Sequence, residues 1–146
     1  MSFTIDSDEI QFVDTNILIY AHDSTAGTKQ ARARDLIDQL WETRLGCLSV
    51  QVMQEFYVVT TQKVANPLEP EIAARIIRNL SQWKVHSPIP EDVLGAIALQ
   101  HRTGASFWDA MILWSAQQLE CPRVWSEDLN HDQEYDGVRV VNPFVV

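Results

Sequence analysis

Two acidic residues follow short apolar runs that the sequence predicts as β-strands. Asp14 comes directly after the β-rich run 10–13, and Asp128 comes shortly after the run 124–125. In open α/β sheets, ligands bind beyond the carboxyl ends of the strands, so both carboxylates are candidates for chemistry. Each also has a simpler interpretation. Asp14 could cap the helix predicted after it, and Asp128 could be a turn residue in a polar loop.

Two more acidic residues lie on predicted helices. Asp109 interrupts 106–119, the most apolar helix of the chain, where a carboxylate needs a partner or a metal ion. Glu55 lies on a helix predicted over 50–64. Simpler interpretations remain open here too. Ser106 and Asp109 have the spacing of a capping box, and Glu55 shares its helical stripe with two glutamines, as a solvated residue would.

A cluster of these four acids would suit a hard divalent cation. Mg²⁺ and Mn²⁺ prefer oxygen ligands, and the four histidines are scattered singly with none at ligand spacing. A bound divalent ion can polarise a phosphodiester oxygen and lower the pKa of a bound water. Without the ion, neighbouring carboxylates repel one another and raise some of their pKa values.

The elements that must position these acids are short strands alternating with long helices. Strands are predicted over 10–13, 47–48, 84–86, 124–125 and 138–141. Helices are predicted over 17–21, 29–44, 50–64, from about 70 to 83, 90–102 and 106–119. The residues 126–137 are expected to form a polar loop, and no hairpin is expected. This alternation predicts an α/β domain around a parallel sheet.

Composition places the chain among acidic globular proteins. It has 146 residues, 46% of them hydrophobic and 21% charged, with a net charge of −9. These values predict a single domain over 1–146. Two cysteines are too few for a disulfide framework, and no apolar run approaches the ~18 residues of a membrane span. Residues 1–6 are acidic where a signal peptide would be basic. We therefore expect a cytoplasmic protein without a membrane partner.

The negative charge disfavours simple electrostatic coating of nucleic acid unless a basic patch or a metal ion intervenes. Lys29 and the arginines that follow it could contact phosphate groups, although a solvated helix face is the simpler interpretation. Trp108 and Trp114 stand at helical spacing, so they are expected in the core rather than as platforms for bases.

Taken together, the acidic motifs resemble those of one family. Asp14-Thr15-Asn16 after a strand resembles the opening motif of PIN-domain nucleases. The later motifs of that family are matched in order by Val52–Phe56 around Glu55, Ser106–Ile112 around Asp109, and Trp125–Asn130 around Asp128. The ending Val138–Phe144 is similar to that of the toxin branch, the VapC-type ribonucleases of toxin–antitoxin pairs. The resemblance runs from about residue 12 to residue 144.

The resemblance implies a three-layer α/β/α sandwich with a central parallel sheet of about five strands. It implies an endoribonuclease that depends on Mg²⁺ or Mn²⁺, with an RNA substrate, a cognate antitoxin protein and a homodimeric state. The catalytic and metal-binding residues would be Asp14, Glu55, Asp109 and Asp128, and the supporting residues Thr15, Asn16, Ser106, Ser126, Asn130 and Asp132.

The chain departs from the family pattern at two positions. Ser126 stands where Thr is commoner, and its hydroxyl can orient its neighbours in the same way. Asn130 occupies a position that is often acidic, which leaves one charge fewer for a second metal unless Asp132 compensates.

Three other functions compete with the nuclease. A phosphatase of the haloacid-dehalogenase type also begins with an Asp after its first strand, but it needs a second Asp where this chain has Asn16. A phosphoacceptor receiver domain needs a late lysine at a strand end, and the last lysine here is Lys84. A non-catalytic module could use the same acids to bind a basic partner.

Overall fold

The computed structural model describes residues 8–145 and contains six strands and six helices in that range. The strands are β1 (Gln11–Val13), β2 (Gly46–Ser49), β3 (Lys84–His86), β4 (Arg123–Trp125), β5 (Glu134–Tyr135) and β6 (Val138–Val141). The helices are α1 (Thr15–Ala21), α2 (Thr28–Thr43), α3 (Val50–Gln62), α4 (Pro70–Leu80), α5 (Pro90–Thr103) and α6 (Phe107–Gln118). The acidic N-terminal residues 1–6 lie outside the described part of the chain. No helix within 8–145 is long and apolar enough to cross a membrane.

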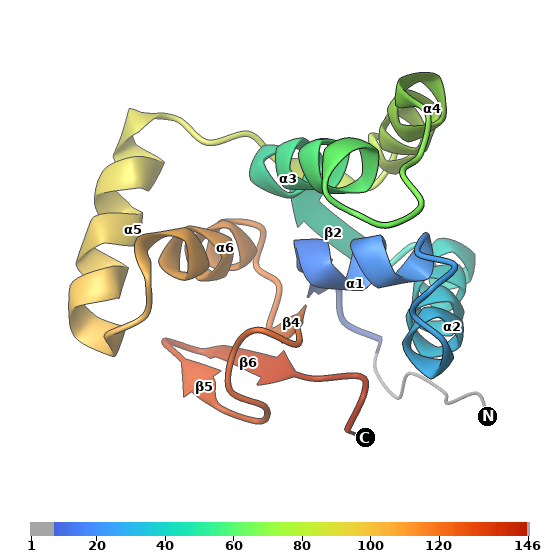
Figure 1. Ribbon diagram of the computed structural model, residues 1–146. Helices are drawn as coiled ribbons and strands as arrows, with labels where there is room; N and C mark the ends of the chain where they lie inside the picture. Colours follow the sequence, from blue (N-terminus) through green and yellow to red (C-terminus); the bar gives the residue numbers. More distant parts are fainter. Residues whose placement is uncertain (1–7, 146) are drawn as a thin grey trace.

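The strands form one sheet in the order β3-β2-β1-β4-β6-β5. β1 pairs in parallel with both β2 and β4, with Phe12 opposite Cys47 on one side and Val124 on the other. Figure 1 shows α5 and α6 packed together on one side of the molecule and α1 and α2 together on the other. The α/β fold with a central parallel sheet, which the sequence predicts, is confirmed.

The sheet has one antiparallel strand that the sequence analysis missed. β5 lies inside the expected polar loop 126–137 and pairs with β6, with Tyr135 opposite Val138. The two residues between these strands, Asp136 and Gly137, have φ angles of 49° and 88°. Positive φ at both central residues favours an Asp-Gly turn of the hairpin type, so the dipeptide was the local signal for this strand.

Serine residues start the two helices that carry Glu55 and Asp109. Ser49 ends β2 and accepts a hydrogen bond from the Val52 amide at 3.4 Å, which caps α3. Ser106 accepts one from the Asp109 amide at 3.2 Å, which caps α6. Such caps satisfy helix amides that otherwise lack a partner. The first turns of both helices are thereby fixed beside the sheet.

Helix α6 supplies much of the core, but one prediction about it is wrong. Residues 110–113 of this helix are buried, and the helix contacts β2, β3, β4 and β6. Trp108, expected in the core, is 64% exposed. It lies in the first turn of the helix, and its ring contacts Phe107 edge to face. Trp114 is partly buried, as expected.

A buried polar network joins α5 to α6 and β3. The carboxylate of Asp92 accepts hydrogen bonds from the Trp114 indole at 3.0 Å and from the Ile89 amide at 2.8 Å. It also lies 3.3 Å from His86, whose other ring nitrogen contacts Ser115 at 2.8 Å. Burial alone would raise the pKa of Asp92, but these donors and the His86 charge together hold it below its ordinary value. The network fixes α6, and therefore Asp109, against the end of the sheet.

The close contact between α5 and α6 predicts an unusual effect of Gly95→Ala. In an exposed helix this change stabilises a protein by about 0.5–1 kcal/mol. Here an added Cβ would lie 2.2 Å from the Trp114 ring. We therefore expect a loss of about 1–3 kcal/mol in the free energy of unfolding, measured by denaturant titration. In a Trp114→Leu background the penalty should disappear, and a stabilising Gly95→Ala in the wild-type background would contradict the packing described here.

Candidate active site

Asp14 is buried where two parallel strands end. It follows β1, and its amide donates to the carbonyl of Trp125 at the end of β4, at 3.0 Å. The residue is 5% exposed. Its carboxylate accepts from the Thr15 amide at 2.7 Å and from the Ser126 hydroxyl at 2.7 Å. The first of these bonds makes Asp14 the cap of α1 as well, so the capping and site interpretations both hold for this residue.

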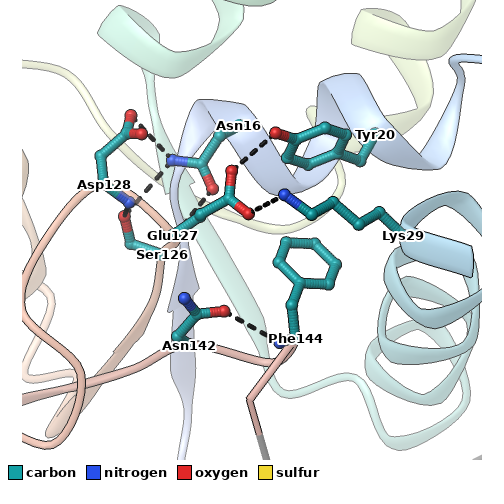
Figure 2. Close-up of polar contacts among 8 residues, drawn as sticks. All are labelled: Asn16, Tyr20, Lys29, Ser126, Glu127, Asp128, Asn142 and Phe144. Carbon is teal, nitrogen blue, oxygen red and sulfur yellow. Dashed lines mark hydrogen bonds and ion pairs between the residues drawn. The ribbon is translucent and has the colours of Figure 1, made fainter. Parts of the chain in front are cut away.

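Asn16 links the elements that carry two of the acids. Its side-chain nitrogen lies 3.3 Å from the Asp14 carboxylate, 3.3 Å from the Ser126 hydroxyl and 3.1 Å from the Asp128 carboxylate. Its side-chain oxygen accepts from the Glu127 amide at 3.0 Å. Figure 2 shows this amide between the β4–β5 loop and α1. Asn16 therefore holds the loop that carries Asp128 beside the first strand.

Glu55 is partly buried and points to the same region, so its interpretation as a solvated surface residue is wrong. One carboxylate oxygen accepts from the Thr15 hydroxyl at 3.1 Å and the other from the Gln51 amide at 2.8 Å. Gln51 is 8% exposed and also reaches the Trp108 carbonyl at 3.4 Å. Its buried side-chain oxygen has no hydrogen-bond partner among the described residues. Gln51 was not predicted as a site residue and had no local signal.

Asp109 and Asp128 complete the acidic cluster. Asp109 is partly buried in the first turn of α6, whereas Asp128 is exposed and its amide donates to the Ser126 hydroxyl at 3.1 Å. The Ser106 hydroxyl accepts from the amide of Asp109, which confirms the capping interaction at this helix start. The Asp109 carboxylate also forms a hydrogen bond with the Ser106 side chain, so both the backbone and the side chain of this acid contact the capping residue.

The four acids act on one another electrostatically. Burial raises the pKa of Asp14 to about 7, and the charges of Asp128 and Glu55 add to this effect while hydrogen bonds from Ser126 and Thr15 oppose it. Burial also raises the pKa of Asp109, a hydrogen bond with the Ser106 side chain opposes this, and the charges of Asp128 and Glu55 again add to the rise. Asp14 and Asp109 therefore both feel the charges of Glu55 and Asp128. We call these four residues the acidic cluster.

A second group of contacts anchors the loop next to the cluster. The carboxylate of Glu127 accepts from the Tyr20 hydroxyl at 2.6 Å and forms an ion pair with Lys29. The Lys29 ammonium lies 5.0 Å from the centre of the Tyr20 ring and 5.4 Å from that of Phe144. Figure 2 shows the three side chains converging from α1, α2 and the C-terminal segment. Burial alone would raise the pKa of Glu127, but its bonds to Lys29 and Tyr20 outweigh it and lower the pKa. Lys29 is therefore engaged by the loop, and Glu127 and Tyr20 are site-positioning residues that sequence reasoning missed.

The two remaining supporting residues lie farther along the same loop. Asn130 donates to the Gln133 side chain at 2.8 Å. Asp132 has a φ of 65° and pairs with Arg139 of β6 at 3.1 Å. Asp132 therefore pairs with a basic side chain on the neighbouring strand.

The donors of the cluster fit a hard divalent cation. They are carboxylate oxygens from four elements, with the unpaired oxygen of Gln51 close to Glu55. Mg²⁺ and Mn²⁺ prefer such ligands, and a buried acid with a raised pKa is a group that a cation would return to its charged form. In the present arrangement the acids are bound by neutral donors such as Asn16 and Thr15. No three acidic, histidine or cysteine side chains within 8–145 already stand at the spacing of a metal site.

The chain belongs to the PIN domain family, whose model matches residues 12–135. No curated protein matches it. Several solved structures share its fold, among them the following three. VapC20 of Mycobacterium tuberculosis, described as a sarcin-ricin loop cleaving toxin, has a TM-score of 0.62 and 16% identity, covering 80% of this chain and 88% of that one. A toxin–antitoxin complex from Klebsiella pneumoniae has a TM-score of 0.63 and 19% identity, covering 91% and 97%. DNA-bound VapBC from Salmonella typhimurium has a TM-score of 0.61 and 17% identity, covering 90% and 96%.

The raised pKa of Asp14 predicts a pH dependence of stability in the metal-free protein. Its carboxyl titrates near its ordinary value of 3.8 in the unfolded chain and at about 7 in the folded one. Between these values the folded state binds more protons, so raising the pH favours unfolding. From about pH 5.5 to about pH 7.5, the wild type should lose about 2 kcal/mol of stability relative to Asp14→Asn, measured by urea titration in chelator.

The comparison between the two proteins isolates Asp14. Burial lowers the pKa of His22, so this residue also contributes to stability near neutral pH, with the opposite sign. Because His22 is present in both proteins, its contribution cancels in the difference. Parallel stability curves for wild type and Asp14→Asn would show that Asp14 titrates at its ordinary pKa.

Proposed function

We propose that this protein is a divalent-metal-dependent endoribonuclease and the toxin of a type II toxin–antitoxin pair. The observation that carries the proposal is the acidic cluster. Asn16 joins Asp14 to Asp128, and the neighbouring Thr15 binds Glu55. Asp109 and Asp128 border the same cavity. Membership of the PIN family and the fold shared with toxins of this class support the same conclusion.

The four carboxylates would hold Mg²⁺ or Mn²⁺. Such an ion supplies a lowered pKa for bound water and neutralises charge on the phosphate that is cleaved. It would also offset part of the net charge of −9, which otherwise repels RNA.

The neighbouring polar residues position these ligands. Ser126 and Asn16 bind Asp14, and Asn16 also binds Asp128. On the other side, Thr15 and Gln51 bind the two oxygens of Glu55. Because these donors are uncharged, they fix the acids without neutralising the negative potential that attracts a cation.

The phosphatase alternative is disfavoured by the role of Asn16. A phosphatase of that type would use the side chain two residues after the first Asp as an acid or base. Here that side chain is an amide that joins Asp14, Ser126 and Asp128. A non-catalytic module that binds a basic partner remains the second candidate, because the cluster would attract cationic side chains as well as a metal. Metal-dependent RNA cleavage by the wild type separates the two.

The proposed toxin requires an antitoxin that restrains it. We propose that a segment of the antitoxin covers the acidic cluster and presents Arg or Lys to the carboxylates, since charge-assisted hydrogen bonds there substitute for the metal. Two of the solved structures with this fold are described as a toxin–antitoxin complex and as DNA-bound VapBC. Homodimerisation and a cytoplasmic location stay predictions.

Asp109→Asn separates metal binding from helix capping. A residue that only caps would cost about 1 kcal/mol or less on this change, with RNA cleavage retained. For a metal ligand, cleavage and the stabilisation of the protein by Mg²⁺ or Mn²⁺ should be lost, because the amide keeps the shape and removes the charge. Without metal, the variant should melt at or above the wild-type temperature, since a repelling charge is removed.

The matched control is Glu91→Gln, which removes an exposed acid from the first turn of α5 in the same way. It should leave metal-dependent cleavage unchanged. Retained cleavage in Asp109→Asn would exclude the metal role of this residue, whatever happens to its stability.

Expression of the chain without an antitoxin tests the toxin role. Wild-type protein should arrest growth of the bacterial host, and Asp14→Asn should not, because the acidic cluster loses its most buried ligand. Growth rate and the soluble protein level are measured together for both chains. Unimpaired growth with confirmed soluble wild type would contradict a toxin even if the purified protein cleaves RNA.

A further inference from the structure

A side cavity opens next to the acidic cluster. It has a volume of about 230 Å³ and is bordered by Asp109 and Asp128. Its other walls are the turn 103–105 between α5 and α6 and part of the β4–β5 loop. Ligand pockets for drug-sized molecules usually measure ~300–1,000 Å³, so this cavity suits a smaller group such as one ring system.

Away from the two acids, the cavity is lined by uncharged groups. The side chains of Asn130 and Gln133 border it, together with Leu129 and Tyr135, which are otherwise buried. None of the side chains that line it is basic. A phosphate would therefore be repelled from the cavity, whereas the uncharged part of a nucleotide would not.

The side-chain amides of Asn130 and Gln133 can form hydrogen bonds with the edge of a ligand ring. The Asn130 side chain donates to the side-chain oxygen of Gln133 at 2.8 Å. The backbone amide of Gln133 donates to the backbone carbonyl of Asn130 at 3.2 Å. The backbone carbonyl of Gln133 also accepts from Val140 of β6 at 2.9 Å, which ties this part of the loop to the sheet. Because the side-chain bond uses one donor of Asn130 and the acceptor of Gln133, the Asn130 oxygen and the Gln133 amino group remain for a ligand.

We propose that this cavity binds one base of the RNA, next to the phosphate that is cleaved, and that Asn130 and Gln133 determine which base is preferred. An unstacked base in single-stranded RNA presents its edge to side chains in this way. Because Asp109 and Asp128 line the cavity, a base bound there would lie close to the proposed reaction centre. The inference rests on the proposed function for its substrate class and adds to it a residue pair that selects sequence.

The test compares cleavage of a randomised single-stranded RNA pool by wild type, Asn130→Ala and Gln133→Ala, with sequencing of the cut ends. Wild type should prefer one base at a position beside the cut. Each variant should reduce that preference by about tenfold, the discrimination that a paired amide contact usually provides. Gln82→Ala, which removes an exposed amide in the turn before β3, should leave the preference unchanged.

A second experiment does not depend on cleavage. The Asp14→Asn protein selects bound sequences from the same RNA pool, with and without Asn130→Ala. If wild type does not cleave RNA but the bound sequences show a base preference that Asn130→Ala removes, the nuclease proposal fails and the base site stands. If cleavage occurs with the same base preference in all variants, or if both variants slow all sequences equally, the base site is wrong and the nuclease proposal stands. A pool with no preference in cleavage or in binding would also overturn the base site.

Discussion

The carboxylate of Asp14 is buried at the end of β1 with two other acids close enough to raise its pKa. Transferring a charged group out of water is unfavourable unless it is paired, and the described residues supply this carboxylate with neutral donors only. The surrounding structure is organised around that constraint. Donors to the Asp14 carboxylate come from Thr15 and Asn16 at the start of α1 and from Ser126 directly after β4.

The parallel direction of the strands brings these residues together. β1 and β4 run side by side in the same direction, so Asp14 and Ser126 emerge at one edge although they are far apart in the chain. The α5–α6 pair then carries Asp109 to that edge, because the Asp92 network fixes α6 against β3. Glu55 arrives from α3, which begins directly after β2 at the same edge. Four elements thus converge without any local sequence signal that links them.

In the resulting site, the groups that carry charge differ from the groups that could distinguish one ligand from another. The acids are held by hydroxyls and amides, which leaves their negative potential available to a cation. The ammonium of Lys29 is paired with Glu127 and lies against aromatic rings, so it stabilises the loop after β4 rather than the acids themselves. The cavity that Asp109 and Asp128 border is otherwise lined by uncharged groups, which adds a region where neutral groups can be discriminated.

The sequence by itself determined the features that depend on near neighbours. The sequence predicts the helix periodicity, the serine caps at Ser49 and Ser106, and the position of Asp14 after a strand. Each of these features depends on only a few neighbouring residues. The Asp136-Gly137 dipeptide is a local signal of the same kind, but the hairpin turn that it forms was not predicted. Only the tertiary structure decided that Glu55 meets Thr15, 40 positions away, and that Asn16 meets Asp128, 112 positions away. The same holds for the exposure of Trp108, since it depends on which face of α6 the rest of the fold covers. Spacing along one chain cannot fix such contacts, because they depend on strand order and helix packing.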